Sequence, residues 1–221
     1  DPSQFDDEDE YVKVLRKLWK RKYDYFNEFS SIDPNHYSNE FDYSNAIENK
    51  KNWMNKYDKN NAYKLDPSDY EFEEEYLDAL RSCWQDKYDP SFKTNIDVDD
   101  YDTEEDYRNA LILDWQETYD PKHQFNGFNF DQFTTIDDYL VELNDRLNWI
   151  KECDEEGKYS KIDASNYDNL IQYKHQINLR KAWKNKYDPN NEHTNINPCD
   201  YSSVEEYHEA IMDFDIRSTK L

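Results

Sequence analysis

The chain has 221 residues, of which 36% are hydrophobic and 35% charged, a balance close to that of a disordered protein. Its 20 Tyr, 11 Phe and 6 Trp residues exclude that class, because so many aromatic rings bury enough area for a core. The net charge of −24 excludes direct binding to nucleic acid, since neutralising phosphates requires basic residues. No apolar run approaches the ~18 residues of a membrane span, so we expect no membrane partner.

All six tryptophans are regularly spaced in the sequence, at intervals of 34, 31, 31, 34 and 34 residues. Four residues after each Trp comes a Tyr, or in one case Cys153, and the next residue is always Asp. This register predicts an internal repeat, and periodic aromatics at helical spacing are typical of a core. The expected structural core residues are Trp19, Trp53, Trp84, Trp115, Trp149 and Trp183.

The repeat divides the chain into six full units and an incomplete seventh, which we interpret as one helical repeat domain over residues 1–221. The first three units open with a shared motif, as DPSQF, DPNHY and DPSDY. In chain order the units span residues 1–32, 33–65, 66–96, 97–128, 129–162, 163–196 and 197–221.

Each unit is predicted to contain one long helix. A Tyr, a Leu or Ile four residues later and the Trp four or six residues beyond form one helical face. A capping box precedes this face in every unit except the one at Phe72. The helices should run roughly sixteen residues and stop around the Tyr-Asp pair, which is followed by Pro in several units. They are expected to begin near Asp7, Asn39, Phe72, Thr103, Thr135, Asn169 and Ser203.

The segments between helices carry a regularly placed Ile or Leu and a Tyr, which we expect to pack against neighbouring helices. Asp followed by Pro predicts one short helical turn in these segments. The predicted fold is therefore all-α: about seven single-helix repeats with a period of 31–34 residues, stacked as a solenoid-like array or a compact bundle. Tetratricopeptide repeats share the 34-residue period, but here each unit has one clear long helix and lacks the Leu-Gly pair.

No motif predicts catalysis or metal binding. The segment DVDDYD at residues 97–102 is similar to a calcium loop, but it lacks the glycine and the closing Glu, so we interpret it as the repeated turn. A Gly-rich phosphate loop, a nucleophile elbow and a nucleotide fingerprint are all missing from the sequence. We expect no enzyme activity, no cofactor and no metal. The histidines, none at a metal-ligand spacing, are His36, His123, His175, His193 and His208.

The first turns of several helices are strongly acidic, as in EFEEEY, DTEEDY and SVEEYHE. A regular row of carboxylates can imitate a phosphate backbone and attract a basic protein surface. We therefore hypothesise an inhibitor that occupies the basic groove of a nuclease or other nucleic-acid-binding protein, by analogy with phage and mobile-element counter-defence. The predicted partner-binding residues are Glu73, Glu74, Glu104, Glu105, Glu205 and Glu206.

The alternative hypothesis is a scaffold or spacer that binds ordinary protein partners, with acidity that serves solubility. Binding that weakens steeply with salt favours the mimic, whereas binding insensitive to salt favours the scaffold. Three cysteines without a paired framework indicate a reducing compartment, and no signal peptide opens the sequence, so we expect a cytoplasmic protein.

Overall fold

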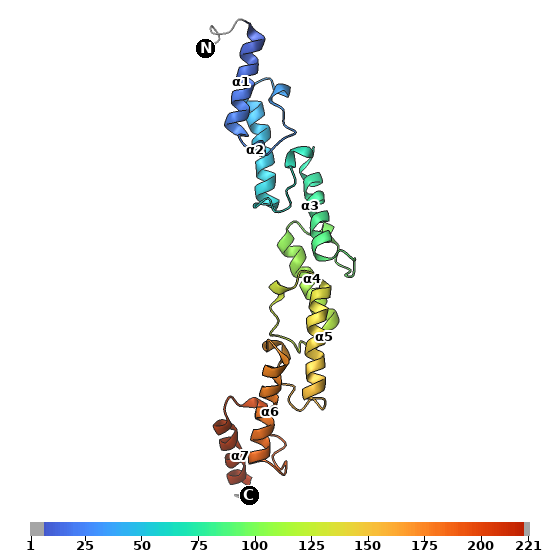
Figure 1. Ribbon diagram of the computed structural model, residues 1–221, viewed down its shortest axis with the longest axis vertical. Helices are drawn as coiled ribbons and strands as arrows, with labels where there is room; N and C mark the ends of the chain where they lie inside the picture. Colours follow the sequence, from blue (N-terminus) through green and yellow to red (C-terminus); the bar gives the residue numbers. More distant parts are fainter. Residues whose placement is uncertain (1–6, 219–221) are drawn as a thin grey trace. The chain divides into compact units, whose positions relative to one another are not determined.

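The structure, a computed structural model, describes residues 7–218 (Figure 1). This part of the chain contains seven α-helices and no strand, which confirms the predicted all-α array of single-helix repeats. The helices are α1 (Glu8–Tyr23), α2 (Glu40–Tyr57), α3 (Glu73–Tyr88), α4 (Glu104–Tyr119), α5 (Ile136–Cys153), α6 (Leu170–Tyr187) and α7 (Val204–Ser218).

The chain packs as two compact parts, and the boundary between Asp114 and Trp115 falls within α4. In the N-terminal half, up to Asp114, α1 packs on α2 and α2 packs on α3 (Figure 1). In the C-terminal half, from Trp115 onward, α5 packs on α6 and α6 on α7. Neighbouring helices thus pack against one another within each half, while the single domain over residues 1–221 stays a prediction.

Every helix begins directly after the residue where the sequence predicts its start. Asp7 shows the usual cap, because its carboxylate accepts the Glu10 N–H at 2.7 Å. Phe72 has no side-chain acceptor, so only half of the capping box remains: the Glu75 carboxylate accepts the Phe72 N–H at 3.2 Å. The first six helices end at the expected Tyr, or at Cys153.

Short 3₁₀ turns lie between the helices, as predicted. In each, an Asp or Asn side chain accepts the N–H two residues ahead, for example Asp33 from Asn35 at 2.8 Å. Only three of these turns contain Pro, so the polar cap is their shared feature. The turn predicted for residues 1–5 lies outside the described residues. The turns are η2 (Pro34–His36), η3 (Pro67–Asp69), η4 (Val98–Asp100), η5 (Phe130–Gln132), η6 (Ala164–Asn166) and η7 (Pro198–Asp200).

Five junctions between neighbouring helices share one pattern of packing. The Trp of one helix lies against the first Tyr of the next, with ring centroids 6.4 Å apart for Trp19 and Tyr43 and 6.5 Å apart for Trp183 and Tyr207. The Ile and Tyr of the connecting segment close the same cluster, as Ile32 does between α1 and α2, which confirms that these residues are packed. Each of these junctions is therefore a small aromatic core.

Candidate partner-binding surface

The first acidic residue of α2, α3 and α4 is held by a lysine–tyrosine pair at the end of the preceding helix, an arrangement we call the clamp. Glu73 accepts hydrogen bonds from Lys56 Nζ and from the Tyr57 hydroxyl, both at 2.9 Å. These bonds, the lysine bond first, hold the pKa of Glu73 below its ordinary value. Glu40 is held in the same way by the pair that ends α1.

The clamp on Glu104 has a third donor. Its Oε1 accepts from Lys87 Nζ at 2.8 Å and from the hydroxyls of Tyr63 and Tyr88, each at 2.6 Å. Burial opposes ionisation here, but the three hydrogen bonds outweigh it, so the pKa of Glu104 is lowered. Glu73 and Glu104, predicted as partner-binding residues, are therefore engaged in packing one helix onto the next.

The second residue of each acidic first turn faces outward. The Glu74 side chain is 70% exposed and pairs with Arg81 at 2.9 Å. Glu105 and Glu205 occupy the same position in α4 and α7 and are exposed. Of the predicted partner-binding residues, these three are placed where a partner can reach them.

Glu206 has a capping role. Its Oε2 accepts the Ser202 N–H at 3.0 Å and the Ser202 hydroxyl at 2.6 Å, which lowers its pKa, while its own N–H donates to the Ser203 hydroxyl. The bond to Ser203 is the forward half of a capping box at the start of α7, and the carboxylate reaches one residue further back, to Ser202. Glu206 is thus exposed but committed to the helix terminus.

The six tryptophans differ in burial. Trp84, Trp115 and Trp183 are buried, whereas Trp19, Trp53 and Trp149 are half-buried. Cations cover two of the half-buried rings: Lys50 Nζ lies 3.5 Å from the Trp53 ring centroid, and the Arg146 guanidinium lies 3.9 Å from that of Trp149. This placement does not favour a stacking platform for bases or sugars.

A buried Asp follows each of the first six helices, and the sequence reasoning assigned it no role. Asp89, 2% exposed, accepts the Lys93 N–H at 2.8 Å, the Thr94 N–H at 3.2 Å and the Thr94 hydroxyl at 2.8 Å. These bonds fold the chain back after the helix. The signal was present in the sequence, because the Asp recurs in all six full units. The six residues are Asp24, Asp58, Asp89, Asp120, Asp154 and Asp188.

Three residues after each buried Asp, the backbone adopts the left-handed conformation, with φ between +48° and +65°. Asn, His and Gly tolerate this conformation, but a bulky side chain there is a genuine outlier. Phe92 is that outlier, with φ of +50° and 74% of its surface exposed. The residues at this position are Asn27, Asn61, Phe92, His123, Gly157 and Asn191.

A hollow opens beside this position in the third unit, where α3 is followed by its loop and η4. It measures about 590 Å³, and its lining residues include Phe92, Asp86, Asp97 and Asp99. None of its lining residues, all within the described chain, is basic. The hollow is therefore lined by one aromatic residue and three acidic residues.

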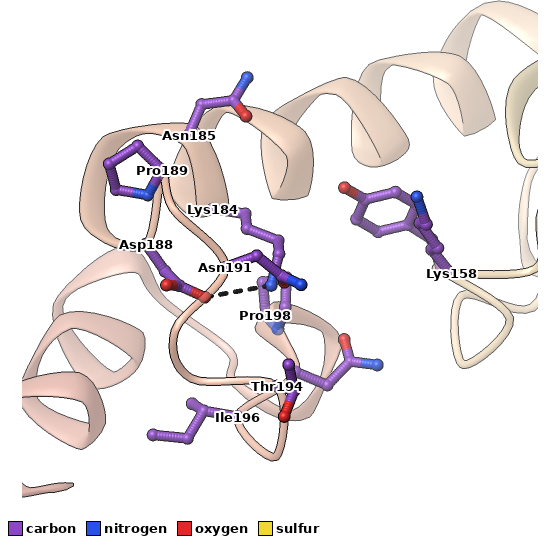
Figure 2. Close-up of a pocket in the computed structure, with 11 residues that line it drawn as sticks. Lys158, Lys184, Asn185, Asp188, Pro189, Asn191, Thr194, Ile196 and Pro198 are labelled. Carbon is purple, nitrogen blue, oxygen red and sulfur yellow. Dashed lines mark hydrogen bonds and ion pairs between the residues drawn. The ribbon is translucent and has the colours of Figure 1, made fainter.

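The matching hollow of the sixth unit measures about 530 Å³ and has different chemistry (Figure 2). Asn185, Asn191 and Asn197 stand where the third unit has Asp86, Phe92 and Asp97. Two lysines also line it: Lys184 pairs with Asp188 at 3.2 Å, and Lys158 comes from the loop after α5. One repeat position thus carries two different surfaces.

The charge of the chain is also uneven. Residues 66–106 contain sixteen acidic and three basic residues, a formal charge of −13, whereas residues 158–188 contain seven basic and three acidic residues, a charge of +4. Arg81, one of the three cations in the acidic segment, is 6% exposed and pairs with Glu74, Asp78 and Asp102. Lys87, the second, is engaged in the clamp on Glu104.

No family model, curated protein or solved structure matches this chain. Among residues 7–218, no helix combines the length and the apolar character that crossing a lipid bilayer requires. The same described residues contain no group of three or more His, Cys, Asp or Glu side chains placed to hold a metal ion. The shape and charge of the surface remain as the guide to function.

Proposed function

We propose that this protein is a non-enzymatic, cytoplasmic binding protein whose acidic surface occupies the basic groove of a nuclease or other DNA- or RNA-handling protein. The observation that carries the proposal is the charge of −13 within residues 66–106. A groove that binds phosphates is rich in Lys and Arg, and a negative field of this density steers such a groove toward the protein. The result is inhibition by competition with nucleic acid, as in counter-defence proteins of phage and mobile elements.

The fold itself uses only part of this acidity. Asp89 and the clamped Glu73 and Glu104 hold backbone or neighbouring helices, so they contribute little to a contact surface. Glu71, Glu74 and Glu105 are exposed and lie at the starts of α3 and α4. These outward carboxylates are the ones we assign to the partner.

The test compares two variants of equal charge. Glu71→Gln, Glu74→Gln and Glu105→Gln together remove outward charge from the acidic segment. The partner is captured from a lysate with the parent protein, identified and purified. We expect the triple variant to bind it roughly 3–10-fold more slowly at low salt, with little change in dissociation, because long-range charge acts on encounter. Added duplex DNA or RNA should compete with the parent protein.

The matched control removes three exposed carboxylates from the C-terminal half, through Asp145→Asn, Glu155→Gln and Glu209→Gln. It makes the net charge less negative by the same amount but leaves residues 66–106 unchanged. Equal slowing by both triple variants would show that only total charge matters. Binding that neither salt nor nucleic acid weakens would refute the mimic.

The second candidate function is a scaffold, and exposed apolar side chains favour it. Phe26, Phe41 and Ile171 are 80%, 70% and 80% exposed, which suits contacts with ordinary protein partners. Salt-insensitive binding that is lost when these three side chains become Ser would support the scaffold instead.

A further inference from the structure

We propose that the hollow of the third unit receives a lysine or arginine side chain of a basic protein partner. The cation lies over the ring of Phe92 and among the carboxylates of Asp86, Asp97 and Asp99, which line the same hollow. This inference rests on the proposed function, because it locates one contact on the acidic surface assigned above.

The hollow has both the space and the charge for a cationic side chain. At about 590 Å³ it is larger than one side chain needs, and Asp86, Asp97 and Asp99 line it together with Gln85 and Asn95. Part of its wall is fixed, since Gln85 Nε2 donates to the Asp89 carbonyl at 2.9 Å and Gln85 Oε1 accepts from the Tyr107 hydroxyl at 3.1 Å. A preformed acidic recess of this kind loses little freedom when a cation enters it.

Phe92 supplies the second element of the site. An aromatic face attracts Lys and Arg, and exposed aromatic side chains are frequent anchors of protein interfaces. The left-handed backbone at Phe92 makes the choice of Phe costly, because Asn or Gly fits there without strain. Local strain of this kind concentrates at functional sites.

The sixth unit shows that the repeat does not require this chemistry. Its hollow has Asn191 at the left-handed position, and Lys158 and Lys184 line it. Lys158 pairs with Glu156 and Lys184 pairs with Asp188, so this hollow lacks the excess of carboxylates found in the third unit. The two hollows therefore differ, and of the six residues at the left-handed position Phe92 is the one with an aromatic hydrocarbon side chain, within the acidic segment of residues 66–106.

The experiment uses the whole protein and a labelled octapeptide of alternating Arg and Gly, followed by fluorescence anisotropy at physiological ionic strength. Phe92→Asn installs the residue found in three other units, so its thermal midpoint should equal or exceed that of the parent. We expect this variant to bind the peptide about fivefold more weakly. NMR shifts caused by the peptide should centre on Phe92, Asp97 and Asp99. A peptide with citrulline in place of Arg should leave these signals unchanged.

Phe72→Ser is the matched control, because Phe72 is another exposed Phe in the acidic segment and Ser suits its N-cap position. This variant should bind the peptide like the parent. Equal weakening by both variants, unchanged affinity in Phe92→Asn, or no shift at Phe92 would overturn the inference. Such a result would leave the proposed function intact if the Glu71, Glu74 and Glu105 variant still slowed binding to the captured protein.

Discussion

The two halves of the molecule hold the first residue of each helix in different ways. In the N-terminal half that residue is Glu40, Glu73 or Glu104, and a lysine–tyrosine clamp binds each carboxylate. In the C-terminal half the equivalent residues are apolar. Ile136 is buried, and Leu170 and Val204 are half-buried. Val204 packs in the cluster around Trp183 and Tyr207.

The difference shows that this repeat does not need acidity to join its helices, since burial of an apolar side chain serves the same purpose. It also separates two populations of carboxylates in the acidic segment. Those in clamps and in the buried Asp positions stabilise the fold, and those at outward positions such as Glu105 are free to serve recognition. A count of acidic residues alone does not distinguish the carboxylates that stabilise the fold from those that face outward.

The largest expected effect compares a buried tryptophan of the N-terminal half with a half-buried one of the C-terminal half. Trp84→Ala removes a ring that is fully buried, and should lower the free energy of unfolding by about 3–5 kcal/mol. Trp149→Ala should cost about half as much, because part of that ring is already exposed. Urea denaturation, with hydrogen exchange to locate the loss, measures both. Equal losses would mean that the difference in burial between Trp84 and Trp149 does not determine how much each ring stabilises the protein.

The second prediction concerns a position that the halves share. Asp89→Ala and Asp120→Ala each leave two backbone N–H groups without their acceptor, at residues 93 and 94 or 124 and 125. Each change should destabilise its own half by about 2–3 kcal/mol, since an unsatisfied buried donor is costly. Thermal unfolding of both variants checks this. A large effect in only one half would show that the buried Asp is not a common element of the repeat.

Much of this fold could be read from the sequence, because its signals are local and repeated. The capping residues and the Tyr-Leu-Trp face predicted every helix start, including that of α3 at Phe72, where the cap is incomplete. The roles of the carboxylates could not be read in the same way. Glu73 and Glu74 are adjacent in sequence, yet one is clamped by Lys56 and the other faces outward.

The reason is that a clamp joins residues sixteen or seventeen positions apart, on two helices whose rotation is set by packing. The left-handed conformation of Phe92 could not be predicted from that residue either, because Phe rarely adopts a positive φ. Alignment of the repeat units reveals the position only because Asn or Gly occupies it elsewhere. Internal comparison of units therefore adds information that one unit alone lacks.

The third prediction is a pH dependence confined to the C-terminal half. His193 Nε2 lies 2.7 Å from Asp215 Oδ1 and Nδ1 lies 3.3 Å from Asp188 Oδ1; the bond to Asp215 is the main cause of its raised pKa. A raised pKa in the folded state gives stability that is full below about pH 6.5 and is lost as the pH rises through the higher value. His193→Thr, the residue of the matching position Thr94, should remove about 1–2 kcal/mol below pH 6.5 and little above the raised pKa.

Thermal unfolding of the parent protein and of His193→Thr across this pH range measures that dependence. The Thr94→His variant is the reciprocal control. Asp89 stands where the sixth unit has Asp188, but the third unit has no counterpart of Asp215, so this variant should gain less pH-dependent stability than His193 provides. A difference between the parent and His193→Thr that stays constant with pH would contradict a role for the protonated ring.

A smaller effect is expected from breaking one clamp. Glu73→Gln keeps the shape of the side chain but loses its charge, and should cost only about 0–1 kcal/mol because both Lys56 and Glu73 are well exposed. The lowered pKa of Glu73 means that its contribution is present at neutral pH and is lost as the pH falls through that lowered value. Chemical denaturation at neutral and at acid pH tests this. A cost that persists at acid pH would assign the effect to packing instead of charge.

The smallest effect comes from building a clamp where the C-terminal half already has the donors. Lys186 and Tyr187 end α6, with Lys186 Nζ 4.8 Å from the Tyr187 ring centroid, and Val204 occupies the first position of α7. In Val204→Glu the new carboxylate gains these donors and the favourable helix N-terminus, worth about 0.3–1 kcal/mol. It loses the burial of a half-exposed Val, so the net change should be close to zero.

Leu170→Glu is the matched control, because α5 ends in Glu152 and Cys153, which provide no lysine–tyrosine pair. That variant should lose about 1 kcal/mol or more, from burial alone. Equal destabilisation by the two substitutions in urea denaturation would show that a clamp depends on more than its three side chains.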